Sequence, residues 1–311
     1  MTVASAQMNV GQKHKGVAMP EYSFDWVDAF ADRPMAGNPC VVVYDAASIP
    51  VPDRIALVRE TRLSECAYLV PSDVADFGAR YYLAGREIPM AGHPTIATVL
   101  SLVDRGHVAI GEPTRFTLEV GAGVIPIEVS GPTQQPRISL TLPAPQFGLR
   151  CDPVEIAAIY GLRQDDIVGT PQLVDAGAGH VIALLRSAEA LVGAQLDIDK
   201  LHAWQAALDV TGAGDIEVYL AVLSGEGTEA RLLLPPPMPP EDPFTGSATG
   251  EMAAYLWHHG LIDTPRFVAR QGHHMGRPGQ AEVELIGTPD AISGVRLTGC
   301  GVVLMRGTLT F

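Results

Sequence analysis

Short apolar runs separated by turn residues dominate the chain, and they predict more strands than helices. Runs rich in Val, Ile, Leu and Tyr are typical of buried or half-buried strands. The expected strands are 40–45, 65–70, 79–83, 123–129, 137–142, 180–185, 217–223, 230–234, 281–285 and 301–311. The expected helices are 52–62, 95–104, 153–160, 199–208 and 248–259. The pattern therefore predicts an α+β protein in which sheet predominates.

Two of these helices belong to segments that repeat one another. Residues 87–106 read EIPMAGHPTIATVLSLVDRG and residues 241–260 read EDPFTGSATGEMAAYLWHHG, at a constant offset of 241 − 87 = 154. A weaker repeat pairs Val-Asp-Ala at 27–29 with the same residues at 174–176. Two repeats in the same order predict a duplicated domain, with the Pro-rich segment 141–153 as the linker between the halves.

Both repeated helices carry apolar or small residues on nearly every face. Such a helix is typically enclosed by other structure rather than lying on a surface. We therefore expect each half to be a strongly curved sheet wrapped around one central helix. The two helix starts then point in equivalent directions.

Two helix starts that face one cleft favour binding of an anion. The first backbone N–H groups of a helix lack internal partners, and the helix dipole adds about half a positive charge there. Two such starts predict a cradle for a carboxylate. The alternative is that His93, Ser247 and Thr249 are simply N-cap residues, a common role for Ser and Thr.

The two copies differ at polar positions. At the offset of 154, His93 corresponds to Ser247 and Asp242 corresponds to Ile88, so the shared scaffold does not require these residues. Substituted positions in a duplicated frame are where an active site is expected to specialise. In the alternative interpretation, Asp242 is a turn residue and His93 bonds a neighbouring carbonyl.

Glu65 is a further candidate because it stands between a helix-like run and a strand-like run. A carboxyl that enters a cleft there has its pKa raised by desolvation, which suits proton transfer near neutral pH. The alternative is an ordinary solvated Glu at the start of a strand.

Composition limits the partners and the location. The 311 residues include 47% hydrophobic residues, enough for a sizeable core, and 35 acidic against 21 basic residues give a formal net charge of −14. That balance argues against nucleic acid or an anionic membrane surface. No segment reads as a leader or a membrane span, and four cysteines without paired spacing predict a reducing, cytoplasmic setting. Residues 1–20 read as a loose extension.

Metal and nucleotide motifs are weak. The pairs His258-His259 and His273-His274 are adjacent in sequence and are not spaced to converge on one metal. The glycine-rich stretches GAGVIP and DAGAGH lack the full dinucleotide-binding pattern. We expect neither a metal nor a cofactor.

The chain after residue 20 resembles the phenazine-biosynthesis PhzF-like family. The resemblance rests on DAFADRPMAGNPCVVV, LSECAYLV, REIPMAGHPT, EDPFTGSATG and QGHHMGRPG. It implies two pseudo-symmetric diaminopimelate epimerase-like halves, each a curved mixed sheet around a central helix, in a metal- and cofactor-independent isomerase that is a homodimer. The implied halves are 21–141, joined by the last strand at 300–311, and 142–299.

The resemblance also implies roles for individual residues. Glu65 is the acid/base that takes and returns a proton, and His93 and Asp242 assist it. The substrate-binding residues are Ser64, Gly92, Gly246 and Ser247. The best-understood family members isomerise dihydro-3-hydroxyanthranilate, which makes a small carboxylate the expected substrate.

The epimerases and racemases that share this fold use two cysteines, one at the start of each central helix. Ala91 and Thr245 occupy those positions here, which disfavours a two-thiol mechanism. A single carboxylate favours movement of a proton on one face. An amino- or imino-acid epimerase or racemase, and a catalytically silent module that binds small anions, stay open as alternatives.

Overall fold

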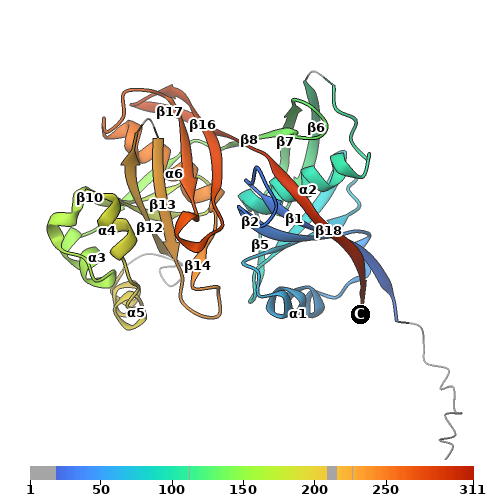
Figure 1. Cartoon of the computed structure of the whole chain (residues 1–311), viewed down its shortest axis with the longest axis horizontal. Coiled ribbons are helices and arrows are strands. Elements are labelled where there is room, and N and C mark those ends of the chain that lie inside the picture. The colour runs from blue at the N-terminus through green and yellow to red at the C-terminus, as the bar shows by residue number, and fades with distance from the viewer. Residues whose placement is uncertain (1–18, 112, 209–215, 226) are drawn as a thin grey trace, which may run out of the picture.

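Two long central helices organise the fold. The computed structural model describes residues 19–111, 113–208, 216–225 and 227–311. Figure 1 shows two lobes, one built around α2 (Gly92–Asp104) and the other around α6 (Gly246–His258). The helices keep the offset of 154 at both ends, since 246 − 92 = 154 and 258 − 104 = 154. The repeat in the sequence therefore corresponds to a repeat in the structure.

The strands of the two lobes are paired in the same order. In the first lobe the strands are β1 (Glu21–Ala29), β2 (Asn38–Val43), β3 (Cys66–Val70), β4 (Phe77–Tyr82), β5 (Glu87–Ile88), β6 (Thr114–Val120), β7 (Gly123–Ser130) and β8 (Arg137–Leu142). In the second they are β10 (Ile167–Asp175), β11 (His180–Leu185), β12 (Glu217–Ser224), β13 (Gly227–Leu233), β14 (Glu241–Asp242), β15 (Arg266–Gln271), β16 (Gly279–Thr288) and β17 (Ala291–Gly299). The pairs β2–β3, β4–β6, β11–β12 and β13–β15 are parallel, and the others along each sheet are antiparallel.

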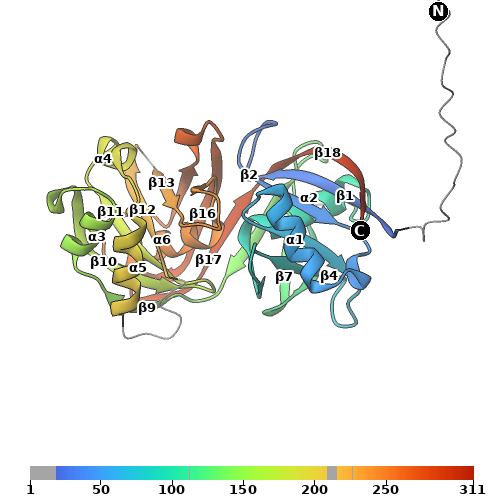
Figure 2. The ribbon, with the colours of Figure 1, turned by 90° about the horizontal axis from the view of Figure 1, so that it is seen from below.

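Two further strands each cross from one lobe to pair with a strand of the other. β9 (Gln146–Arg150) pairs with β10, and β18 (Gly301–Thr310) returns to pair with β1 in the first lobe. Figure 2 shows β18 beside β1, far from the rest of the C-terminal half. The two lobes are also joined directly, because β8 pairs with β17.

The central helices are enclosed as their composition predicts. Every residue of α2 from Gly92 to Val103 is buried, and α6 is buried from Ala248 to Trp257. The sheets wrap around them, so the largest hydrophobic core surrounds both helices. A mixed α+β fold of two pseudo-symmetric halves is confirmed.

The shorter helices lie outside this core. They are α1 (Val51–Thr61), α3 (Pro153–Ile159), α4 (Ala188–Gly193) and α5 (Ile198–Ala207). In α3 and α5 an Asp at the N-cap accepts a backbone N–H, which satisfies one of the unpaired donors of the first turn. They cover the outer faces of the sheets, away from the central helices (Figure 1).

Each predicted strand and helix overlaps an observed one, but the linker is wrong in its extent. The predicted linker 141–153 contains β9, which pairs with β10 of the second lobe, so the segment that leads from the first lobe to the second is shorter than predicted. The expected extension at 1–20 lies outside the described residues except for Met19 and Pro20. None of the helices described is long and apolar enough to cross a membrane.

Candidate active site

The starts of the two central helices meet. A Cβ atom added to Gly92 would lie only 3.1 Å from Gly246 Cα, so two glycines allow the helix ends to approach closely. The N-cap residues are Ala91 and Thr245, and neither side chain accepts a capping bond. The alternative that His93, Ser247 and Thr249 are N-caps is therefore wrong.

Both helix starts open into one cavity between the lobes. Its volume is about 520 Å³. It is lined by all seven residues that sequence and resemblance nominate: Ser64, Glu65, Gly92, His93, Asp242, Gly246 and Ser247. Residues as far apart in the chain as Ser64 and Ser247 thus surround one space.

The Glu65 carboxyl lies on the wall of this cavity, directly before β3. Its side chain is 18% exposed, and its Oε2 lies 3.6 Å from His93 Nδ1. Among the described residues Oε2 has no hydrogen-bond partner. Burial raises the pKa of Glu65 well above its ordinary value, and the charges of Asp242 and Glu217 raise it further. The Glu65 carboxyl therefore holds a proton more readily than an exposed glutamate does.

Asp242 belongs to the second lobe, and hydrogen bonds hold its carboxylate in place. Its Oδ1 accepts a hydrogen bond from the Asn38 amide at 2.9 Å, and its Oδ2 accepts one from the Thr245 hydroxyl at 2.6 Å. The same Asn38 nitrogen donates to the carbonyl of Phe244 at 2.8 Å. Both carboxylate oxygens are thus engaged, and Asn38 ties the first lobe to the second.

His93 is buried in the first turn of α2. Its Nδ1 lies 3.2 Å from Asn38 Nδ2, and its Nε2 is buried without a partner among the described residues. Burial lowers the pKa of His93 to about 4, outweighing the opposite effect of Asp242. The imidazole is therefore neutral at pH 7. The two N–H groups of Asn38 Nδ2 donate over shorter distances to Asp242 and Phe244, so the contact with Nδ1 does not fix the tautomer of His93.

The two serines differ in their surroundings. The Ser64 hydroxyl is buried and donates to Asn38 Oδ1 over 3.4 Å. Ser247 is half-buried in the first turn of α6 and faces the cavity. Ser64 thus supports the Asn38 network, while Ser247 is open to a ligand.

Several residues at the site were not predicted individually. Asn38 belongs to the motif DAFADRPMAGNPCVVV, and His180 ends the glycine-rich stretch DAGAGH, but neither pattern by itself indicates a role for these residues. His180 and Glu217 line the cavity, and the fully buried Glu251 contacts His180. Glu251 could have been noticed in the sequence, because it is a single charged residue inside an otherwise apolar helix.

No thiol takes part in this arrangement within the described residues. Cys40 and Cys66 are buried, and burial raises the pKa of Cys66 to about 12 and that of Cys40 well above its ordinary value. Among the same residues, no three His, Cys, Asp or Glu side chains are placed to hold a metal ion. The expected independence from cofactors stays a prediction.

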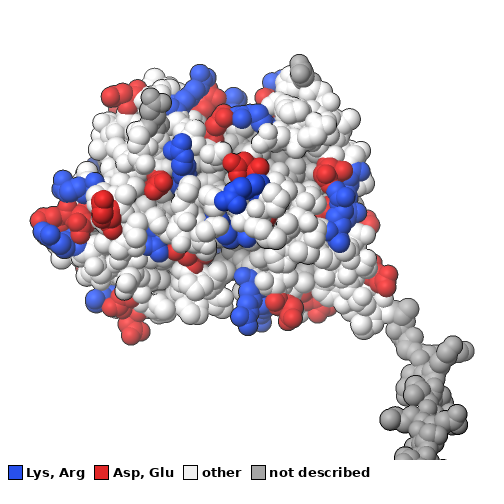
Figure 3. Space-filling view, in the orientation of Figure 1, with Lys and Arg blue, Asp and Glu red and all other residues white. Residues whose placement is uncertain are grey.

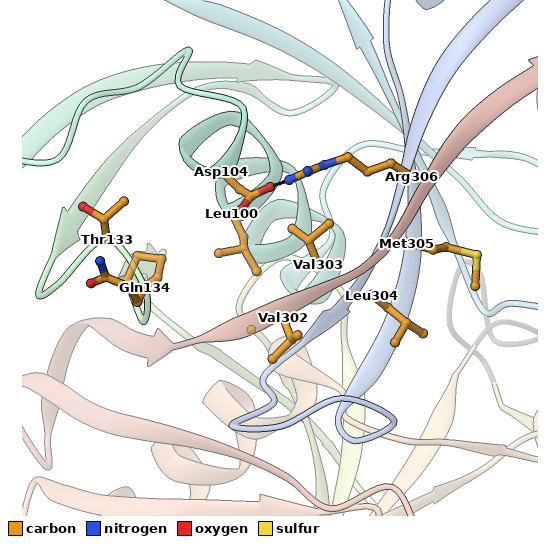
Figure 4. Close-up of a pocket in the computed structure, with 11 residues that line it drawn as sticks. Leu100, Asp104, Thr133, Gln134, Val302, Val303, Leu304, Met305 and Arg306 are labelled. Carbon is orange, nitrogen blue, oxygen red and sulfur yellow. Dashed lines mark ion pairs between the residues drawn. The ribbon is translucent and has the colours of Figure 1, made fainter.

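Another cavity, of about 490 Å³, lies against β18 (Figure 4). Figure 4 shows its lining, which includes apolar side chains of β18 such as Val302 and Leu304 together with the polar Thr133 and Gln134. Its charged residues, Asp104 and Arg306, are paired with each other. Since none of the candidate residues faces it, the cavity between the lobes is the candidate active site.

Acidic and basic side chains are interspersed on the surface. Figure 3 shows this on one face of the molecule, where no extended basic patch is present. The pattern agrees with the excess of acidic residues in the sequence. The surface gives no indication of a polyanionic partner on that face.

Fold and cavity together define the class of the protein: a diaminopimelate epimerase-like fold with a polar site between its halves. A hydroxyproline epimerase from Agrobacterium vitis, solved with trans-4-hydroxy-L-proline, has this fold, with a TM-score of 0.67 at 14% identity over 93% of this chain and 91% of that chain. A predicted epimerase from Pseudomonas aeruginosa is more similar, with a TM-score of 0.78 at 26% identity over 93% and 99%.

Residues 27–307 match the family described as phenazine biosynthesis-like protein. The chain belongs to this family. It is 28% identical, over 91% of its own length and 97% of the relative's, to the trans-2,3-dihydro-3-hydroxyanthranilate isomerase of Pseudomonas chlororaphis. The PhzF-like resemblance found in the sequence is confirmed.

Proposed function

We propose that the protein is an isomerase that moves a carbon-bound proton within a small carboxylate, with Glu65 as the acid/base. The observation that carries the proposal is the Glu65 carboxyl itself. It lines the cavity, its pKa is raised by desolvation, and its buried Oε2 has no hydrogen-bond partner among the described residues. Such a group can accept a proton from carbon and return it. Names of relatives, an isomerase and a predicted epimerase, support the same reaction class.

The proposed reaction needs no other proton carrier. The substrate carboxylate binds at the starts of α2 and α6, where backbone N–H groups are unpaired. Glu65 removes a proton from a carbon next to a double bond, so a C–H bond breaks while an O–H bond forms and the electron pair moves into the unsaturated system. Neutral His93, in the tautomer that carries its proton on the unpartnered Nε2, donates to the substrate oxygen that gains charge. Glu65 then returns the proton to another carbon on the same face, and the double bond is shifted.

Asp242 has an indirect part in this scheme. Its carboxylate is held by Asn38 and Thr245, so we assign it the role of a fixed charge that raises the pKa of Glu65. A raised pKa makes the protonated Glu65 a less acidic but still competent donor near neutral pH. The acid limb of the pH–rate profile is therefore expected above the usual carboxyl range.

A second candidate function is epimerisation with two carboxylate bases. It is favoured by one observation: Glu217 lies at the start of β12 as Glu65 lies before β3. Val41 pairs with Cys66 and Val181 pairs with Val218, which puts the two glutamates in matching registers of the two lobes. Both line the cavity. Two opposed bases are what inversion at a carbon centre requires.

Proton NMR in deuterated water distinguishes the candidates. The test compound is trans-2,3-dihydro-3-hydroxyanthranilate, the substrate in the name of the relative, followed by other small unsaturated and amino carboxylates. Deuterium incorporation with a shifted double bond supports the isomerase. Incorporation with inversion supports the epimerase. If every compound binds but none exchanges a proton, both the isomerase and the epimerase are ruled out. The remaining interpretation is a catalytically silent module that binds small anions.

A homodimer is part of the proposal, because the family resemblance implies one. Sedimentation velocity checks it directly over a range of concentrations. A species of 33.0 kDa at all concentrations would contradict it.

A further inference from the structure

Glu251 is a buried carboxylate that the proposed reaction does not use. It lies in the middle of α6 and is 0% exposed. Its Oε1 accepts hydrogen bonds from the N–H groups of Ala176 and Gly179, each at 3.0 Å. Its Oε2 lies 2.6 Å from His180 Nδ1. All of these donors belong to one loop and its exit, so Glu251 fixes the shape of that loop and the orientation of the imidazole.

His180 presents its other side to the active-site cavity. It is the first residue of β11, it is 7% exposed, and it lines the cavity together with Gly177 and Gly179. Its Nε2 lies 3.9 Å from Glu217 Oε2, beyond hydrogen-bond distance. Nδ1 is therefore anchored by Glu251, while Nε2 makes the longer ion-pair contact with Glu217 at the cavity.

The surroundings favour the charged imidazolium. Burial lowers the pKa of His180, but the carboxylates that face it outweigh this effect and the pKa is raised overall. These carboxylates are Glu251 from α6, Glu217 from β12 and Asp242 from β14. A short contact between Nδ1–H and Glu251 is the geometry of a charge-assisted hydrogen bond.

The first lobe has no such arrangement. At the offset of 154, the counterpart of Glu251 is Ala97, which is fully buried in α2 (251 − 154 = 97). The fold therefore does not require a carboxylate at this position. Burying a charge in a helix that could carry alanine is costly unless the charge is paired, as Glu251 is.

We propose that His180 is a cationic binding residue for the substrate, with Glu251 as the positioning residue that keeps it protonated. The imidazolium Nε2–H donates a hydrogen bond to an anionic oxygen of the substrate, on the wall of the cavity formed by the second lobe. This inference rests on the proposed function, in which the cavity binds a small carboxylate. It deepens that function by assigning the group that distinguishes an anion from its neutral analogue.

The proposal predicts the direction in which substrate affinity changes with pH. Below the pKa of His180 the imidazolium is present and binding is strong. As pH rises through that pKa the charge is lost, so KM increases while kcat changes little, because His180 does not carry the transferred proton. Charged hydrogen bonds of this kind typically contribute a factor of roughly 10–100 in affinity.

The test compares two ligands that differ in charge. Calorimetry measures binding of 3-hydroxyanthranilate and of its carboxamide, chosen because the relative named above acts on a dihydro derivative of the acid. In the wild-type protein the acid should bind more tightly. In His180→Gln its affinity should fall roughly 10- to 100-fold while that of the carboxamide changes little. His202→Gln, at an exposed position of α5, is the matched control and should change neither.

Glu251→Gln is a second variant that keeps the shape of the site. The Gln carbonyl can accept from Ala176 and Gly179, and its amide can donate to Nδ1, which leaves His180 neutral with its proton on Nε2. NMR titration of the His180 ring should then give a lower pKa than in the wild-type protein. The preference for the acid and its pH dependence should both weaken.

The outcomes separate this inference from the proposed function. If wild-type protein turns over a carboxylate but His180→Gln and Glu251→Gln bind the acid as tightly as wild type does, the assignment of His180 is wrong while the isomerase stands. If the wild-type protein binds neither ligand and catalyses no exchange on the compounds tested, both fail together. If the pKa of His180 is the same in Glu251→Gln as in the wild-type protein, Glu251 does not keep His180 protonated. The assignment of His180 itself would then still stand.

Discussion

The two lobes have the same scaffold but shift the pKa values of their buried histidines in opposite directions. His93 comes from the first lobe and His180 from the second, and both line the same cavity. Burial lowers the pKa of His93 to about 4, whereas three carboxylates raise the pKa of His180. The difference shows that burial alone does not set the charge of a histidine. A single buried acid, Glu251 in place of Ala97, accompanies the change in direction.

The same comparison extends to the carboxylates. Glu65 and Glu217 occupy matching positions next to parallel strand pairs, but their surroundings differ. Glu65 is next to the neutral His93, and Glu217 lies 3.9 Å from His180. Burial and the charges of Asp242 and Glu217 raise the pKa of Glu65, which suits it to accept a proton. The duplicated frame thus supports unequal roles for equivalent residues.

The largest expected effect is a loss of turnover, and it should occur for Glu65 but not for Glu217, the residue at the matching position. Glu65→Gln should abolish proton exchange with solvent, because an amide cannot take a proton from carbon. Glu217→Gln, the matched control from the other lobe, should retain turnover. Both variants are followed by deuterium incorporation and by binding of a small carboxylate, which should persist in both. Equal loss in the two variants would instead favour the two-base epimerase.

The next effect separates the histidines. His93→Leu should lower kcat by roughly 10²–10⁴, the usual range for acid–base assistance, and His93→Gln should recover part of the loss because its amide can donate near the position of Nε2. His180→Gln, by contrast, should mainly raise KM. Steady-state kinetics on all three variants checks the contrast. A negligible effect at His93 would reduce it to a packing residue.

The smallest effect concerns the contact between the lobes. Gly92→Ala adds a methyl group 3.1 Å from Gly246 Cα, so the helix starts must separate by a few tenths of an ångström. We expect a loss of about 1–3 kcal/mol in the free energy of unfolding, as for other overpacked sites. Gly193→Ala in α4 is the control, since its Cβ meets no atom within 4 Å. Urea denaturation measures both, and equal stability of the two variants would show that the contact is not tight.

Much of the scaffold could be predicted because the repeat is carried by residues with strong local preferences. Gly and Pro mark the starts of α2 and α6, and the offset of 154 is kept without a gap. β10 was missed for a local reason: Gly169 adopts a left-handed conformation and the ladder is irregular between Val168 and Gln172. This interruption hides the alternation that identifies a strand.

The site could be predicted only in part, because its polar contacts join distant segments. Glu65, His93 and Asp242 were found through motifs, and the structure brings them to one cavity, while their catalytic roles stay proposals. The Asn38 amide reaches Asp242 across 204 residues, and no pattern in a single sequence encodes such a pair. Glu251 was visible as a lone charge, but its partner became evident only when the loop before β11 was placed.

The pairing of β18 with β1 has a consequence for how the protein is made. Glu21 pairs with Thr310, so the first sheet includes strands from the two ends of the chain. During synthesis, β1 can pair with β2 early, but its second neighbour, β18, is made only after the strands of the second lobe. Contacts of such long sequence separation also slow folding. The first lobe therefore completes its edge last, and a chain cut short before β18 leaves that edge open to other strands.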